Sequence, residues 1–129
     1  MLSKEEKELL LKDLCARLPY GVKVKFGDNP NIFDLEYRIK FAAMYGDSDK
    51  LEDILDITNI KPYLRPMSSM TGVETLEYLS LKESIVASDD ITYSFETYES
   101  IDWLDKNMFD YRGLIPMGLA EDATDKNIY

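Results

Sequence analysis

The strongest periodic pattern in the chain is an alternation of apolar and charged residues over positions 33–41. In a β-strand successive side chains point to opposite faces, so apolar residues at every second position share one face. The pattern therefore predicts a half-buried strand of nine residues, and a chain that contains it needs an apolar layer to cover that strand. The apolar positions are Phe33, Leu35, Tyr37, Ile39 and Phe41, and the charged ones are Asp34, Glu36, Arg38 and Lys40.

Further strand patterns lie on either side of this segment. Residues 22–26 alternate in the same way, and residues 27–31 between the two patterns are turn-forming Gly, Asp, Asn and Pro. Residues 51–60 suit a short turn or helix followed by a strand near 56–60. We therefore expect a small, strongly bent antiparallel sheet over about residues 22–60, with an SH3-like partial barrel as one form of it.

Three helices are expected around this sheet, over residues 3–18, about 72–83 and about 97–107. A Ser or Thr stands at each start, and in the first two a Glu follows three residues later, which is the spacing of a capping box. Between the second and third helices, residues 85–87 and 91–95 are expected to pair as a hairpin. The chain is thus predicted to be one α+β domain, residues 1–129, whose sheet is flanked by N- and C-terminal helices and followed by a short tail.

The chain has no His and a single cysteine, Cys15, which restricts its chemistry. Ser-His-Asp and Cys-His catalytic arrangements and His-based zinc sites are excluded. We expect Cys15 to be a small buried hydrophobic residue, and we expect no cofactor and no enzymatic activity. A metal-dependent hydrolase built from carboxylates is the enzymatic alternative, but the acidic pairs lack EF-hand spacing and are expected to be solvated. These pairs are Asp47 and Asp49, Asp89 and Asp90, and Glu121 and Asp122.

The formal net charge is −10, and it is unevenly distributed. Residues 1–82 hold 14 acidic and 12 basic residues, whereas residues 83–129 hold 11 acidic and 3 basic residues. Duplex DNA is not expected as a partner, because DNA-binding proteins need a basic face. The acidic half favours solubility, and it also suits a basic protein partner or mimicry of nucleic acid. With no apolar run near 18 residues and a charged N-terminus, the chain is expected in the cytoplasm, without a membrane partner.

The first candidate binding segment is residues 61–71, which two prolines stiffen. Arg65 offers a planar fork for a carboxylate or phosphate, and the segment leads into a helix N-terminus, where backbone N–H groups favour anions. Its hydroxyl-bearing side chains are Tyr63, Ser68, Ser69 and Thr71. The segment is therefore a candidate cradle for an anion or nucleotide. The alternative is a structural crossover in which Arg65 pairs with an internal acid and Thr71 only caps the helix.

The second candidate segment is residues 109–115. Tyr111 can stack on a base or a peptide ring, and Asp110 with Arg112 can orient a ligand. The alternative is a packed corner after the preceding helix. No catalytic or metal-binding residue is expected, and the expected ligand-binding residues are Tyr63, Arg65, Ser68, Ser69, Thr71, Tyr111 and Arg112.

Three strings in the chain carry a resemblance: KDLCARLPYGVKVK at 12–25, KPYLRPMSSMT at 61–71 and DWLDKNMFDYRGLI at 102–115. Through them the chain resembles a family of small uncharacterised proteins of Bacteroides-type gut bacteria and their prophages and phages. The resemblance implies a mobile element in the cytosol of a bacterial host. Small proteins without catalytic residues in that setting often act by binding.

The function expected from this resemblance is that of a non-catalytic phage or mobile-element binding protein. In one form it is an anti-defence protein that sequesters a cyclic nucleotide or another anionic small molecule, or that blocks a host defence protein. The alternative is a protein-interaction or structural accessory protein with no small-molecule ligand. A homo-oligomer is a further expectation, because apolar side chains are available for a surface contact at Leu2, Leu9, Met67 and Met70.

Overall fold

The computed structural model describes residues 2–45, 59–86 and 92–129. The helices are α1 (Lys4–Arg17), α2 (Leu35–Tyr45), α4 (Gly72–Leu81) and α5 (Tyr98–Lys106). The strands are β1 (Lys23–Phe26), β2 (Phe33–Asp34), β3 (Ile60–Leu64), β4 (Glu83–Val86), β5 (Thr92–Phe95) and β6 (Glu121–Asp122). Within the described ranges, no helix combines the length and apolar character that a membrane span requires.

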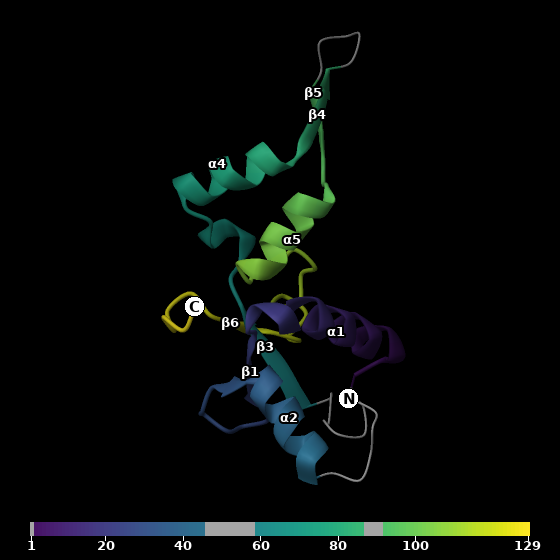
Figure 1. The fold of residues 1–129 in the computed structure, drawn as a ribbon, viewed down its shortest axis with the longest axis vertical. Coiled ribbons are helices and arrows are strands. Elements are labelled where there is room, and N and C mark those ends of the chain that lie inside the picture. The colour runs from purple at the N-terminus through teal and green to yellow at the C-terminus, as the bar shows by residue number, and fades with distance from the viewer. Residues whose placement is uncertain (1, 46–58, 87–91) are drawn as a thin grey trace.

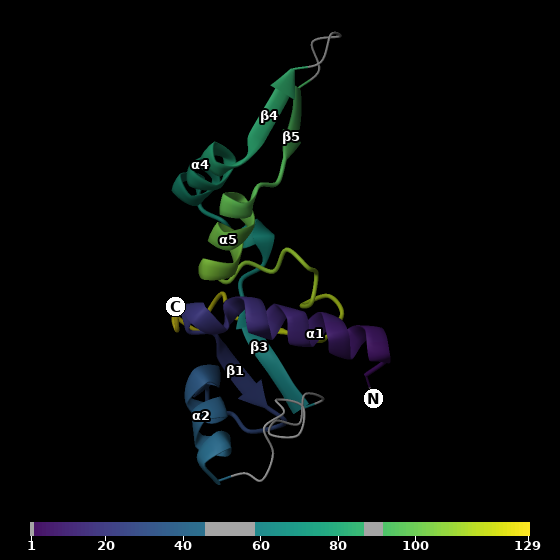
Figure 2. The same ribbon diagram turned by 45° about the vertical axis from the view of Figure 1, so that its right-hand side comes forward.

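The molecule is elongated, with different elements at its two ends (Figure 1). The strands β1 and β3 and helix α2 lie toward one end, and α1 crosses the middle. At the other end lie α4, α5 and the β4–β5 hairpin, which projects away from the rest, as Figure 2 shows from a second direction. We call α4, β4, β5 and α5 together the arm.

The main sheet has the strand order β2-β1-β3-β6. Strand β1 pairs antiparallel with β2 and β3, whereas β6 pairs parallel with β3 through Tyr63 and Leu64. The sheet is therefore mixed and open, and it does not close into a barrel. The expected α+β class with flanking helices is confirmed. The strands described within the predicted range of about 22–60 pair antiparallel, and the sheet is mixed only through β6, which the chain adds after it has passed through the arm.

The predicted nine-residue strand over 33–41 is wrong: only Phe33 and Asp34 are strand, and a helix begins at Leu35. Helical spacing brings Glu36 and Lys40 together, so that Lys40 Nζ lies 2.9 Å from Glu36 Oε1. Leu35 is buried in the core, while Tyr37, on the predicted buried face of the strand, is exposed. Alternation predicted the wrong period because Leu35 and Ile39 also lie four residues apart, on one face of a helix.

The main core lies between the sheet, α1 and the segment before β6. Its fully buried members include Leu10, Leu14, Val24, Leu64 and Leu114. Leu2 and Leu9, which were expected to be available for an oligomer contact, pack against this core instead. The prediction that Cys15 is buried was wrong, because it lies off the Leu10–Leu14 side of α1 and is exposed.

A second, smaller core holds the arm to the rest of the chain. The ring of Trp103 stacks between Tyr78 and Phe109, at centroid distances of 5.7 and 5.5 Å.

The three helices that the sequence predicts are all present, and α1 and α4 begin with the predicted capping boxes. The predicted hairpin is also confirmed, with Glu83 opposite Phe95 at its base. The strand predicted near 56–60 is described only from residue 59, and Asp47, Asp49, Asp89 and Asp90 lie outside the described residues.

Candidate functional site

The candidate cradle at residues 61–71 is held together by internal contacts of Arg65. Its two terminal nitrogens donate to Glu74 Oε2 and Oε1 at 2.7 and 2.8 Å, a two-pronged ion pair. The guanidinium carbon also lies 4.2 Å from the centre of the Phe109 ring. The hydrogen bonds from Arg65 lower the pKa of the Glu74 carboxyl from 4.5 to about 2, so this acid is charged at neutral pH. Arg65 therefore has the internal acid partner that the structural alternative expected.

The hydroxyls of this segment serve mainly its own backbone. Thr71 Oγ1 accepts a hydrogen bond from the Glu74 backbone N–H at 3.2 Å and caps α4. Ser69 Oγ donates to the Pro66 carbonyl at 2.7 Å, and Ser68 is exposed. Tyr63 is buried in strand β3. These four side chains do not converge on one point with Arg65.

The second candidate segment, residues 109–115, joins the first through its backbone. The Arg65 N–H donates to the Met108 carbonyl at 2.7 Å, and the Asp110 N–H donates to the Arg65 carbonyl at 2.8 Å. Asp110 is buried and accepts hydrogen bonds from two backbone N–H groups, those of Leu114 and Ile115, each at 2.8 Å. The segment is therefore the packed corner of the structural alternative, and it lies beside β3.

Tyr111 and Arg112 point to a different place from Arg65. Arg112 Nη1 lies 2.6 Å from Asp13 Oδ1 and 3.5 Å from Asp105 Oδ1. The Tyr111 hydroxyl donates to the same Asp105 oxygen at 2.9 Å. Burial raises the pKa of Tyr111 to about 12, so this hydroxyl keeps its proton at neutral pH. The seven expected ligand-binding residues are thus divided among several places.

A buried charge cluster that the sequence did not predict links α1 to this corner. Asp13 and Arg17 are fully buried, and Arg17 Nε lies 3.0 Å from both carboxylate oxygens of Asp13. Arg17 Nη2 donates to the Phe109 carbonyl at 2.6 Å, while its Nη1 is buried without a hydrogen-bond partner in the described part of the chain. A charged pair four residues apart on the Leu10–Leu14 face of a helix was the available signal. We call Asp13, Arg17, Asp105 and Arg112 the charge cluster.

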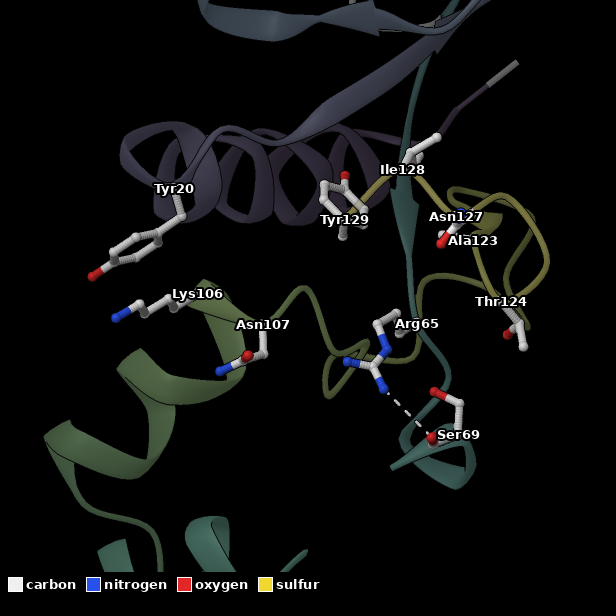
Figure 3. A pocket seen from close by; sticks show the side chains of 10 residues that line it. All are labelled: Tyr20, Arg65, Ser69, Lys106, Asn107, Ala123, Thr124, Asn127, Ile128 and Tyr129. Carbon is white, nitrogen blue, oxygen red and sulfur yellow. Dashed lines mark hydrogen bonds between the residues drawn. The ribbon is translucent and has the colours of Figure 1, made fainter. Parts of the chain in front are cut away.

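A cleft of about 650 Å³ lies beside two of the predicted residues (Figure 3). Of the seven predicted residues it contains only Arg65 and Ser69. It is lined by Tyr20, Arg65, Ser69, Lys106, Asn107, Ala123, Thr124, Asn127, Ile128 and Tyr129. The Tyr129 hydroxyl donates to the Tyr63 carbonyl at 2.8 Å, which fixes the end of the chain against β3.

The charges around this cleft do not form a strong anion site. Arg65 is neutralised by Glu74, and the side chains of Tyr20 and Lys106 extend away from Arg65 in Figure 3. The Tyr20 hydroxyl donates to Asp102, and this bond raises the pKa of the tyrosine. Lys106 is also the last residue of α5, and the free carbonyl groups at the C-terminal end of a helix carry partial negative charge that repels an anion.

The other unusual surface is an apolar row on α4. Val73, Leu76 and Leu79 are 69%, 71% and 51% exposed, and a spacing of three residues places them along one side of the helix. We call these three residues the α4 stripe. Tyr78 of the same helix packs inward, on Trp103.

Further apolar side chains are exposed elsewhere on the arm. Tyr98 at the start of α5 is 93% exposed, and Phe95 at the base of the hairpin is also exposed. Large exposed apolar patches are uncommon on monomeric proteins and often mark contact sites. Sequence periodicity alone could not identify this surface, because it gives the apolar side of α4 but not whether another element covers it.

Comparisons with known proteins add no identity to these findings. No family model matches the chain, and neither the curated proteins nor the solved structures provide a significant match. Among residues 2–45, 59–86 and 92–129, no group of three His, Cys, Asp or Glu side chains is arranged to hold a metal ion.

Proposed function

We propose that this chain is a non-catalytic protein-binding protein, and that the arm is its contact surface. The observation that carries the proposal is the α4 stripe, whose three aliphatic side chains face solvent. Burying such side chains against a partner gains about 1.5–3 kcal/mol for each one that becomes fully buried. The arm also ends in an isolated two-stranded hairpin, a structure that is only marginally stable in water without further packing.

Of the binding modes expected from the sequence, protein contact has more support than capture of a nucleotide. An anion at Arg65 would have to replace Glu74, which holds both terminal nitrogens of the guanidinium. In the mobile-element setting that the resemblance implies, the bound protein would belong to the host. Such a contact would suit either role expected from the resemblance, which are the blocking of a host defence protein and accessory assembly of the element.

Affinity capture with matched variants tests this proposal. The stripe variant carries Val73→Gln and Leu76→Gln, and the control variant carries Met44→Gln and Met117→Gln, which remove exposed apolar side chains outside the arm. Tagged proteins are produced in the natural host cell, and retained proteins are quantified by mass spectrometry. We expect a partner that the wild type and the control retain and that the stripe variant loses by at least about fivefold. Identical sets from all three proteins would contradict the proposal.

A second candidate function is the binding of a small anionic molecule in the cleft. The observation in its favour is that Lys106 and Asn107 line the same cleft as the aromatic residues Tyr20 and Tyr129. Calorimetric titration with a panel of cyclic nucleotides tests it. Heat of binding that disappears in a Lys106→Gln variant would support it, and no heat with any nucleotide would exclude this class of ligand.

A further inference from the structure

The charge of the arm indicates what kind of partner fits it. Residues 72–106 contain nine acidic residues and two basic residues, Lys82 and Lys106. Two of the acids, Glu74 and Asp105, pair with Arg65 and Arg112 outside the arm. Lys82 is largely buried, and its Nζ lies 3.5 Å from Glu96 Oε1, so it does not offset the exposed acids. The arm therefore combines an exposed apolar row with a strongly negative charge.

Exposed acidic side chains stand close to the apolar ones along the chain. Glu77 follows Leu76 on α4, and Glu99 follows Tyr98 on α5. Glu83 lies opposite Phe95 at the base of the hairpin. All three of these acids are exposed. A partner that covers the apolar side chains therefore approaches a negatively charged part of the molecule.

We propose that the arm binds a basic amphipathic helix of a partner protein, with the apolar side of that helix lying on the α4 stripe. This inference rests on the proposed function and adds the chemistry of the partner. The stripe is a ridge of residues three positions apart on a helix of ten residues, and a second helix with apolar residues three and four positions apart can pack against such a ridge. Lys and Arg side chains on the flanks of that helix would be attracted by Glu77 on α4 and by the negative charge of the rest of the arm.

The same charges argue against other occupants. A second copy of this chain would bring a second acidic arm against the first, and like charges repel at such a contact. Nucleic acid and the surface of an anionic membrane carry the same sign of charge as the arm. A basic protein segment is the occupant that satisfies both the apolar row and the charge.

Synthetic peptides test this inference on the full chain. The first peptide is a helix of about 18 residues with Leu on one side and Lys on the other. The second has Glu in place of every Lys, and the third has the Leu and Lys residues of the first in a scrambled order without an apolar side. Binding is measured by the fluorescence anisotropy of labelled peptide. We expect the first peptide to bind at least about tenfold more tightly than either of the others.

Variants separate a specific site from general attraction of charges. The stripe variant keeps every charge, and it is expected to weaken binding of the Lys peptide by at least about tenfold. A Glu77→Gln, Glu83→Gln, Glu99→Gln variant keeps the stripe, and it is expected to weaken binding and to reduce its salt dependence. The Met44→Gln, Met117→Gln control is expected to bind as the wild type does. For the wild type, raising NaCl from about 50 to 300 mM should weaken binding strongly.

Failure of this inference can be distinguished from failure of the proposed function. Equal binding of the Glu and Lys peptides, or Lys-peptide binding unchanged in the stripe variant, would overturn the basic helix as the occupant. A partner still lost by the stripe variant in affinity capture would then leave the arm as a protein-contact surface. The salt series on the wild type requires no substitution, so the charge preference is tested even if a variant does not fold.

Discussion

Replacing Arg17 with Met should destabilise the protein more than any single surface change. Arg17 is fully buried, and the replacement removes its contacts with Asp13 and with the Phe109 carbonyl. Removing one partner of a buried ion pair typically costs about 3–5 kcal/mol, because the other charge is left in a medium of low dielectric constant. We expect about 3 kcal/mol, the lower end of that range. Arg112 remains 2.6 Å from Asp13, and the unpaired Nη1 of Arg17 is removed with the side chain.

Urea unfolding followed by far-ultraviolet circular dichroism measures this loss. With a slope of about 2 kcal/mol per molar urea, the midpoint should fall by roughly 1.5 M. Lys12→Met is the matched control, because Lys12 is an exposed residue of the same helix and receives the same side chain. The control should lie within about 0.5 kcal/mol of the wild type. An Arg17→Met variant within about 1 kcal/mol of the wild type would refute the structural importance of the charge cluster.

Three further predictions concern single groups. Because the folded-state pKa of Glu74 is depressed to about 2, its ion pair with Arg65 stabilises the fold above pH 4.5 and is lost as the pH falls toward 2. Between pH 7 and 2.5 the urea midpoint of unfolding should therefore fall more steeply for the wild type than for Arg65→Gln, and parallel curves would contradict this. Thr71→Ala should cost about 1 kcal/mol in urea unfolding through loss of the helix cap, whereas Thr71→Ser should cost much less, and equal losses would contradict the capping role. Cys15 should react with a thiol reagent in the native protein, and labelling that requires denaturant would contradict its exposure.

Local signals in the sequence predicted the helices more reliably than the strands. The capping boxes at Ser3 and Thr71 placed the starts of α1 and α4 correctly, because a cap depends only on residues within one turn. The alternation over 33–41 failed, because a run with apolar residues at both two- and four-residue spacing fits a strand and a helix. Packing of Leu35 and Ile39 against the core decides between them, and that packing depends on residues far away in the chain.

For the candidate site, the sequence correctly indicated the structural interpretation of residues 61–71 and 109–115, but not a binding site. The expectation that Arg65 pairs with an internal acid holds, and Glu74 was already visible as the third residue of the capping box. The charge cluster was missed because its members come from residues 13–17 and 105–112, which no local pattern brings together. The exposure of the α4 stripe was missed because a sequence shows which side of a helix is apolar, but not that the second core receives only Tyr78 from α4.

Site-specific photo-crosslinking from position 76 tests the central claim most directly. A photoreactive amino acid replaces Leu76 on the α4 stripe in one protein and Met44, which is 75% exposed on α2, in another. Both proteins are irradiated in the natural host cell. We expect a discrete adduct with another protein from position 76 and none from position 44. The same adducts from both positions, or no adduct from position 76, would contradict the arm as a protein-contact surface.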